Sequence, residues 1–229
     1  MTPGPFSLVV DAGSALARVR WSTAADGDFH LDGNPVALQH RRQAFLPGSW
    51  TQLDEVHGTV VRTVLAPGGF DRAEGDAAVT TCPGAVLAVW VGDCAPVVLV
   101  GNGGVGVVHA GWRGAAGGVL EAAVSALRSV CGSEMSALLG PCIHPCCYEF
   151  GASDMQPFAD RLGPSVVGRT SWGAPALDMP AVVGAVLGNV GVGLRTVAGC
   201  TACSGDTWFS HRRGHRARQV MAVALGARA

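Results

Sequence analysis

The sequence has few charged residues and no excess of either sign. Only 14% of its 229 residues are charged, and the formal net charge is −1 at pH 7. The chain therefore lacks the excess of basic residues with which nucleic-acid-binding proteins bind the phosphate backbone. Apolar residues, in contrast, make up 48% of the chain, which is enough to build a large buried core.

Long hydrophobic runs are absent as well. Glycine, proline or a charged residue interrupts every apolar stretch before it reaches the length of a membrane-spanning helix. The first residues, MTPGPFSLVV, contain no basic segment followed by an apolar run of signal-peptide length. We therefore expect no contact with a membrane and a cytoplasmic location.

Cysteine is too sparse for a disulfide framework in a chain of this length. The eight cysteines are Cys82, Cys94, Cys131, Cys142, Cys146, Cys147, Cys200 and Cys203. Reduced thiols are the expectation, some of them structural and some able to bind a metal. The C-x-x-C motif that ends at Cys203 resembles half of a zinc ribbon or a redox pair. Because a second such motif is missing, a structural role is the better interpretation.

The most informative stretch reads GDCAPVVLVGNGGVGVVHAGWRG and covers residues 92–114. Two β-branched runs, at 97–100 and 105–108, predict buried strands joined by a tight Asn-Gly-Gly turn. If the strands pair antiparallel, Cys94 and His109 lie at the same end of the sheet. Such a pair is a nucleophile with its base, two ligands of a metal, or a buried thiol beside a satisfied histidine.

Hydrophobic patterning predicts the other elements. Helices are expected at 36–45, 120–131, 154–162 and 178–187, and strands at 6–10, 17–21, 50–56, 60–65, 85–91, 136–139, 194–197 and 219–224. Asn34 and Asp178 are expected to cap two of the helices. Pro157 is expected in the first turn of its helix, and the basic cluster at 40–42 is expected to face solvent. No repeat or linker interrupts the pattern, so residues 1–229 are predicted to form one domain.

The HAGWRG motif precedes the predicted helix at 120–131. Arg113 is therefore expected just before a helix N-terminus, where backbone donors and the helix dipole favour an anion such as phosphate. This arrangement predicts an anion site a few residues from His109.

Four motifs together identify a family resemblance. They are VHG around His57, GDCAPV around Cys94, HAGWRG around His109, and GPCIHPCCYE, with further matches in GDAAVT, LDM, the Cys200-Thr201 pair and FSHRR. In these the chain resembles the multicopper polyphenol oxidase or laccase-domain family. Bacterial members of that family are associated with purine nucleoside chemistry. The similarity covers most of the chain from about residue 50 onward.

The resemblance implies a layered α+β fold with mixed β-sheets flanked by helices. It also implies a zinc ion held by His57, Cys94 and His109. Two imidazoles and one thiolate leave the fourth position of zinc open, as in catalytic sites. Cys94, His109 and Arg113 are the catalytic candidates.

The sequence departs from the family pattern in its first third. Residues 20–24 run directly into 26–28 without the usual Thr-Arg-x-Gly-Gly-Val-Ser-like loop, and Glu55 stands where the family usually has Gln. The pocket is therefore expected to be altered on this side.

The function that the resemblance implies is zinc-dependent chemistry on purine nucleosides. The expected reactions are phosphorolysis of adenosine, inosine or methylthioadenosine, and deamination of adenosine. The partners are then a small nucleoside and phosphate, with the oligomeric state left open. One alternative is a Cys–His hydrolase or editing factor that acts on peptidoglycan precursors. Another is a zinc-containing binding protein without enzymatic activity.

Two other enzyme classes do not suit the sequence. A copper oxidase needs many histidines, typically in His-X-His pairs, and this chain has seven histidines and no such pair. The cytidine deaminases carry H-x-E followed by P-C-x-x-C. Here His109 is followed by Ala110 and Gly111, and the cysteines after Pro141 are spaced by one residue too many.

Overall fold

The hairpin predicted around residues 97–108 lies at the centre of the molecule. The computed structural model describes residues 6–227. In it, β7 (Ala95–Gly101) pairs antiparallel with β8 (Gly104–Ala110), and every residue of both strands is buried. Pro96 lies opposite His109. Cys94 therefore comes out at the same end of the sheet as His109, as predicted.

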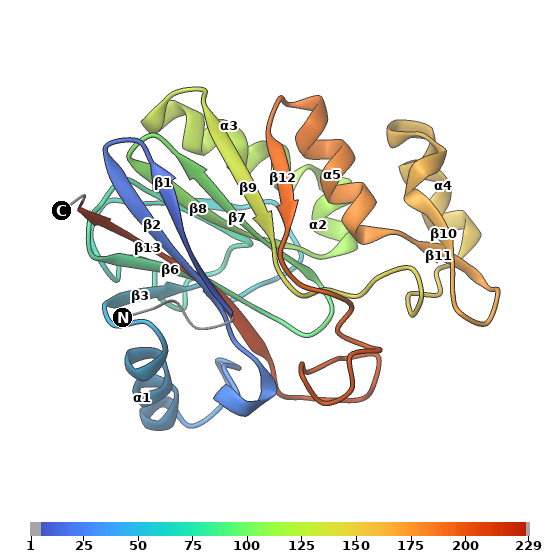
Figure 1. Ribbon diagram of the computed structural model, residues 1–229, viewed down its shortest axis with the longest axis horizontal. Coiled ribbons are helices and arrows are strands. Elements are labelled where there is room, and N and C mark those ends of the chain that lie inside the picture. The colour runs from blue at the N-terminus through green and yellow to red at the C-terminus, as the bar shows by residue number, and fades with distance from the viewer. Residues whose placement is uncertain (1–5, 228–229) are drawn as a thin grey trace.

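Two mixed sheets face each other (Figure 1). The six-stranded sheet has the order β12 (Gly193–Thr196), β9 (Met135–Leu139), β7, β8, β5 (Ala77–Thr80) and β4 (Val61–Val64). The five-stranded sheet has the order β1 (Ser7–Ala12), β2 (Ala15–Trp21), β13 (Gln219–Ala227), β6 (Ala85–Val91) and β3 (Ser49–Gln52). A short pair, β10 (Val167–Arg169) and β11 (Pro175–Leu177), lies apart from both sheets.

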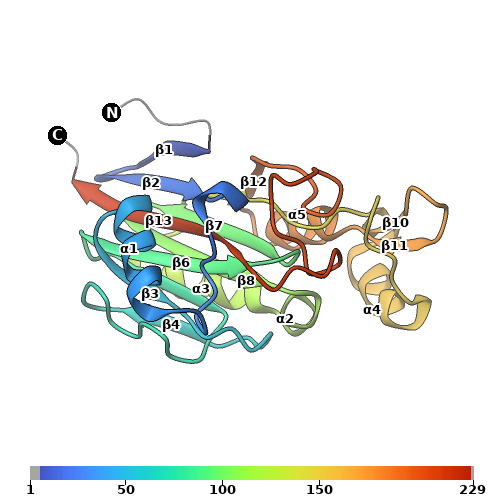
Figure 2. The ribbon, with the colours of Figure 1, turned by 90° about the horizontal axis from the view of Figure 1, so that it is seen from below.

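Helices cover the two outer faces of this sandwich (Figures 1 and 2). On one side, α1 (Pro35–Phe45) packs on the five-stranded sheet. On the other side, α3 (Val119–Cys131) and α5 (Met179–Asn189) pack on the six-stranded sheet. The short α2 (Trp112–Gly117) precedes α3, and α4 (Ala152–Leu162) lies beyond α5. This layered α+β fold, with mixed sheets flanked by helices, confirms the predicted fold class.

Apolar side chains fill each of the three spaces between these layers. Valines and leucines of both sheets, such as Leu87 and Val107, form the core between the sheets. Leu120 and Leu187 of the helices pack on the outer face of the six-stranded sheet. Phe29 and Trp50 fill the space beneath α1, where their rings stack with centroids 6.3 Å apart.

The helix caps form as the sequence predicts. Asn34 Oδ1 accepts from the backbone N–H of Ala37 at 3.0 Å, and Pro35 occupies the first helical position of α1. Asp178 Oδ1 accepts from the backbone N–H of Ala181 at 2.9 Å in the same way. These side chains satisfy donors that the first turn of a helix leaves free.

Several predicted boundaries differ from the structure by a few residues, and two of the differences change the interpretation of a residue. The strand expected at 50–56 ends at Gln52, because the chain leaves the sheet there and reaches His57 in a left-handed conformation, with φ of 59°. The helix expected at 154–162 begins at Ala152. Pro157 therefore lies in its second turn and not in its first.

The segment after His109 also differs from the prediction. Gly118 has φ of 95°, a left-handed conformation that ends α2 and separates it from α3. Arg113 is therefore the second residue of the short α2, and it lies six residues before the first residue of α3. Arg113 thus lies in the first turn of the helix that directly follows His109, and the anion site expected there stays a prediction.

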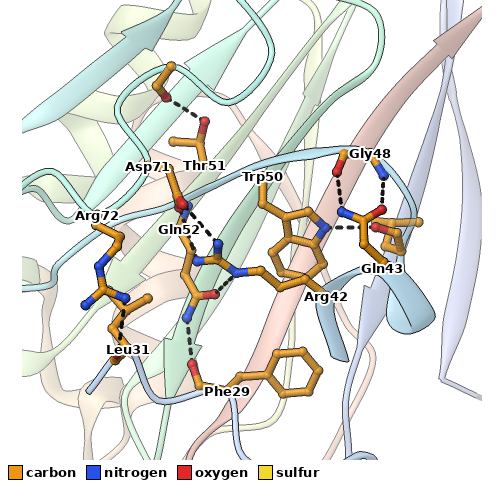
Figure 3. Close-up of polar contacts among 12 residues, drawn as sticks. Phe29, Leu31, Arg42, Gln43, Gly48, Trp50, Thr51, Gln52, Asp71 and Arg72 are labelled. Atoms are coloured by element: carbon orange, nitrogen blue, oxygen red, sulfur yellow. Dashed lines mark hydrogen bonds and ion pairs between the residues drawn. The ribbon is translucent and has the colours of Figure 1, made fainter. Parts of the chain in front are cut away.

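The basic cluster at 40–42 faces solvent only in part. His40 is exposed, but Arg42 is 5% exposed. Its Nη1 and Nη2 donate to the two Asp71 carboxylate oxygens at 2.9 and 3.1 Å, and its Nε donates to Gln52 Oε1 at 3.1 Å (Figure 3). The Arg42 side chain thus ties α1 to β3 and to the loop after β4.

We expect Arg42→Ala to lower the free energy of unfolding by about 2–3 kcal/mol, because charge-assisted bonds to a largely buried group are lost. Urea unfolding followed by tryptophan fluorescence measures this change. His40→Ala is the matched control on the same helix and should change stability by less than about 0.5 kcal/mol. Equal midpoints for the two variants would contradict the structural role of Arg42.

Within residues 6–227, no helix is long and apolar enough to cross a membrane. The assignment of residues 1–229 to one domain stays a prediction, and its outermost residues, 1–5 and 228–229, lie outside the part that the structure describes.

Candidate metal centre and pocket

His57, Cys94 and His109 come together from three different segments. His57 lies in the loop between β3 and β4, Cys94 lies between β6 and β7, and His109 lies in β8. Their potential ligand atoms are all within 4.8 Å of one another. His57 Nε2 is 3.7 Å from Cys94 Sγ, and the two imidazole rings are 4.8 Å apart at 80°. The three side chains thus form a group that can bind a metal ion.

Asp76 positions both histidines. Its carboxylate, which is fully buried, accepts from the backbone N–H groups of His57 and Gly58 at 2.9 and 2.7 Å. It also accepts from His109 Nδ1 at 2.9 Å. Burial alone would raise the pKa of Asp76, but the hydrogen bonds from His109, Gly58 and His57 lower it below its ordinary value. The ionised carboxylate holds the His57 turn and the His109 ring in one arrangement.

The bond to Asp76 also selects the tautomer of His109. A carboxylate can only accept, so Nδ1 of the ring carries the proton and Nε2 is left to bind a metal. A carboxylate behind a ligating histidine is the usual support of a protein metal site. The donors and their support therefore fit a metal ion.

Glu55 lies behind the same histidine. Its Oε2 is 3.5 Å from His109 Nδ1, and its Oε1 accepts from the backbone N–H of Trp90 at 2.8 Å. Burial raises the pKa of Glu55 to about 8, against the opposing influence of His109. The departure from the family pattern at this position thus places a carboxyl group directly at the site.

The Cys94 thiol is disposed to ionise. Desolvation opposes ionisation, but the charge of His109 and hydrogen bonds with both histidines lower the pKa of Cys94 to about 6. A thiolate is the form that binds metals and acts as a nucleophile. The low pKa of the Cys94 thiol is therefore compatible with the two functional interpretations of the Cys–His pair, a nucleophile with its base or two metal ligands.

Asp93 holds the backbone beside Cys94 in place. It has φ of 107°, which is a strained conformation for a residue other than glycine. Its buried carboxylate accepts from Thr201 Oγ1 at 2.5 Å, from Ser210 Oγ at 3.1 Å and from the backbone N–H of Arg212 at 2.7 Å. These bonds fix the crossing from one sheet to the other at the point where Cys94 is presented.

Gly111 lets HAGWRG approach the three side chains closely. A Cβ atom there would lie 2.6 Å from His57 Cδ2 and 3.3 Å from Cys94 Sγ. A Cβ at Gly114 would lie 2.9 Å from the Gly58 carbonyl oxygen. Larger residues at these two positions would displace the loop that carries His57.

A cavity of about 400 Å³ opens above the three side chains. Besides them, its wall includes Arg113 and several residues to which the sequence analysis assigned no role. These are His30, Trp90, Asp93, Ile143, Tyr148, Met179, His211, Arg212 and Arg218. Some belong to the motifs GPCIHPCCYE, LDM and FSHRR, which indicated the family without indicating the pocket. His30, Trp90 and Arg218 lie in no motif. Glu55, where the sequence departs from the family pattern, also lines the cavity.

Arg113 points its guanidinium over the Trp112 ring, 4.4 Å from the centroid. Trp112 in turn packs edge-on against Phe150, with centroids 5.4 Å apart. Arg113 is exposed and lines the cavity, and no other residue in the described part of the chain forms a hydrogen bond or ion pair with its guanidinium. Its charge therefore remains available to a bound anion.

Comparison with known proteins gives consistent matches. The family described as multi-copper polyphenol oxidoreductase laccase matches residues 25–226. A protein of Xylella fastidiosa (strain Temecula1) named purine nucleoside phosphorylase is 35% identical over 211 residues, covering 83% of this chain and 79% of that protein. The Streptomyces griseus protein named purine nucleoside phosphorylase ORF3 is 36% identical over 214 residues, covering 85% and 86%.

Solved structures share the fold. A Neisseria meningitidis protein superposes with a TM-score of 0.81 at 27% identity, covering 96% of this chain and 99% of that one. YlmD from Geobacillus stearothermophilus superposes with a TM-score of 0.77 at 26% identity, covering 99% and 94%. These matches extend over both sheets and over the segments that carry His57, Cys94 and His109.

Proposed function

The chain belongs to the multi-copper polyphenol oxidoreductase laccase family, and on that basis we propose that it is a zinc-dependent purine nucleoside phosphorylase. The relatives named purine nucleoside phosphorylase support a purine nucleoside enzyme in general. The observation that carries the proposal is the meeting of a three-donor metal group with an unpaired arginine in one cavity. Adenosine, inosine and methylthioadenosine are the proposed substrates.

Zinc suits these donors better than copper, the metal named in the family's description. One thiolate and two imidazoles form a mixed sulfur and nitrogen set that zinc binds tetrahedrally, with one position left open. When bound there, zinc would supply Lewis-acid polarisation to a ligand at that position. His57, Cys94 and His109 are the residues that would hold it. Multicopper oxidation would need more histidines than this site offers.

The cavity also offers positive charge for a phosphate. The sequence contains no lysine, so every permanent cation of the wall is an arginine. Arg218 already donates to backbone carbonyls of residues 215–217, and Arg212 lies over the Tyr148 ring. The Arg113 guanidinium also lies over a ring, that of Trp112, but it forms no hydrogen bond or ion pair within the described structure. Its planar fork matches two phosphate oxygens. We therefore assign phosphate binding to Arg113.

The aromatic part of the wall suits a purine base. The rings of His30 and Trp90 lie 4.4 Å apart, and Tyr148 faces the same cavity. Aromatic rings can stack on the flat face of any nucleobase, whatever hydrogen-bonding groups its edge carries. In phosphorolysis a phosphate oxygen bonds to ribose C1′ while the bond from C1′ to the base breaks. The residues of the wall must therefore hold base, ribose and phosphate together.

Product analysis with adenosine, inosine and methylthioadenosine, each with and without phosphate, tests the proposal. Release of free base together with ribose 1-phosphate (or its methylthio analogue) only when phosphate is present is the expected result. Ammonia released from adenosine without phosphate would instead show a deaminase. Absence of turnover of every nucleoside would favour the hydrolase or the binding protein.

Arg113→Ala is expected to lower kcat/KM for phosphate by a factor of about 10² or more, because a charged contact to the reacting anion is lost. Zinc content should stay unchanged. Steady-state rates at subsaturating phosphate measure the effect. Arg195→Ala is the matched control, since Arg195 is an exposed arginine of β12 outside the cavity wall. Equal rates for the two variants would assign Arg113 to structure alone.

A further inference from the structure

Four thiols gather outside the cavity, in a second group that the sequence does not reveal. Cys146 and Cys147 come from the loop after β9, and Cys200 and Cys203 come from the loop after β12. Their four Sγ atoms all lie within 4.8 Å of one another. The C-x-x-C motif of Cys200 and Cys203 therefore lies beside a second pair of cysteines, Cys146 and Cys147, which come more than fifty residues earlier in the chain.

The spacing of these sulfur atoms fits a tetrahedral metal site. Cys146 Sγ and Cys203 Sγ are 3.7 Å apart. Zinc–sulfur bonds of about 2.3 Å at tetrahedral angles place neighbouring sulfur atoms roughly 3.8 Å apart. All eight cysteines of the chain, each within the described residues, are free thiols. Only small adjustments are needed for all four thiolates to reach one ion.

The backbone holds the two cysteine-bearing loops together. Cys142 and Cys200 form a parallel bridge in which the Thr201 N–H donates to the Cys142 carbonyl at 2.9 Å. The N–H of His144 donates to Cys200 Sγ at 3.4 Å. A third segment joins them, because the N–H and Oγ of Ser171 both donate to the Cys146 carbonyl, at 2.9 and 2.7 Å. The thiols are thus brought together before any ion binds.

Without a cation, two of these thiols, Cys146 and Cys147, resist ionisation. Desolvation, and hydrogen bonding with Cys203, Cys200 and Cys147, raise the pKa of Cys146 above its ordinary value. Desolvation and the neighbouring Cys200 raise the pKa of Cys147 to about 11. Desolvation also opposes ionisation of Cys200, yet backbone N–H groups of His144, Cys203 and Ala202 lower its pKa. The charge of a divalent cation would offset the desolvation that keeps Cys146 and Cys147 protonated.

We propose that Cys146, Cys147, Cys200 and Cys203 bind a structural zinc ion, distinct from the group at His57, Cys94 and His109. Four thiolates select a thiophilic ion over calcium or magnesium. They also fill all four positions of zinc, which leaves no place for a substrate and makes the site structural. This inference does not rest on the proposed nucleoside chemistry.

The position of the four-thiol site gives it a role in shaping the cavity. Tyr148 directly follows Cys147, and its ring lies 5.3 Å from the guanidinium carbon of Arg212. Arg212 also donates to the Cys147 carbonyl at 3.4 Å. Both side chains line the cavity above Cys94. A zinc ion behind them would hold two segments of the cavity wall at a fixed separation.

Zinc X-ray absorption on the Cys94→Ser protein tests the inference without altering any of the four thiols. The protein is purified with a thiol reductant, loaded with zinc and freed of loosely bound metal. We expect about one zinc ion per chain with a shell of four sulfur atoms at about 2.3 Å. Absence of bound zinc, or a shell dominated by nitrogen and oxygen, would overturn the proposal.

Metal analysis of further full-length variants provides the second measurement. The wild-type chain and Cys82→Ser should hold about two zinc ions each, and Cys146→Ser/Cys203→Ser should hold about one. Equal zinc in the wild type and in the folded double variant would overturn the proposal. If the wild type and Cys94→Ser both hold one ion in a four-sulfur shell, the four-thiol site stands and only the zinc assignment at Cys94 fails.

Discussion

Cys94→Ala is expected to lose the metal of the His57, Cys94 and His109 group, and to lower kcat/KM for nucleoside phosphorolysis by about 10³-fold or more. The thiolate is one of only three protein donors, and a site with three ligands cannot lose one and still hold zinc firmly. A loss of 10³-fold corresponds to about 4 kcal/mol of transition-state stabilisation. Metal analysis and steady-state kinetics on the same preparation measure both effects.

The control for this experiment is Cys82→Ala. Cys82 is also a partly buried free thiol, but its Sγ contacts the Val64 carbonyl at 3.7 Å and it does not line the cavity. It should keep both metal and activity. If Cys94→Ala keeps its full metal content, Cys94 is not a ligand. If it loses the metal but retains wild-type activity, the metal has no part in the reaction.

Asp76→Asn is expected to reduce the free energy of unfolding of the metal-free protein by about 3 kcal/mol. The substitution keeps the shape of the side chain but removes a buried charge that accepts three hydrogen bonds. The NH₂ group of the new asparagine would also face one of the N–H groups that donate to Asp76 in the wild type, and two donors cannot form a hydrogen bond. Because His109 would lose its support, zinc affinity should fall by about 10-fold to 100-fold.

Denaturant unfolding in the presence of a chelator separates the stability effect from metal binding, and competition with a chromogenic chelator measures the affinity. Asp54→Asn is the matched control, because Asp54 is an exposed aspartate of the loop between β3 and β4 that carries His57. It should change stability by less than about 0.5 kcal/mol. A stable Asp76→Asn protein with unchanged zinc affinity would show that the carboxylate does not organise the site.

Features that depend on neighbouring residues in the chain could be predicted from the sequence. The β7–β8 hairpin follows from two β-branched runs around Asn102 and Gly103, and its geometry brings Cys94 to the same end of the sheet as His109. Asn34 and Asp178 cap their helices through bonds to the residue three positions later. His57 joined the candidate group only through the family resemblance, because it lies in a loop whose direction the sequence does not give.

Features that depend on distant pairing could not be predicted. Asp76 reaches His109 because β5 pairs with β8, which places Ala77 opposite Val108. Arg42 is buried because Asp71, on a separate loop, supplies the opposite charge. Nothing in the sequence indicates that the two residues of either contact are neighbours. The sequence therefore predicts a solvent-facing side chain for Arg42 and no particular role for Asp76.

The four-thiol group is the clearest case. Cys200 and Cys203 form a familiar half-motif, but Cys146 and Cys147 are adjacent and match no standard zinc spacing. The parallel pairing of β9 with β12 and the bridge between Cys142 and Cys200 bring the two loops together. Arg212 of the motif FSHRR donates to the carbonyl of Cys147 in GPCIHPCCYE, and Arg212 and Tyr148 line the same cavity, so these two motifs contribute to one wall.

The place of β13 in its sheet sets the order in which the protein can fold during synthesis. This strand lies between β2 and β6. Residues 219–227 therefore connect the β1–β2 hairpin to β6 and β3, although β13 is synthesised long after all four of these strands. Until β13 leaves the ribosome, β1–β2 and β3–β6 are separate pieces with unpaired edges. Such long-range pairing is slow to form and exposes the incomplete chain to aggregation. The edges of β2 and β6 therefore stay open to non-native pairing until β13 is inserted between them.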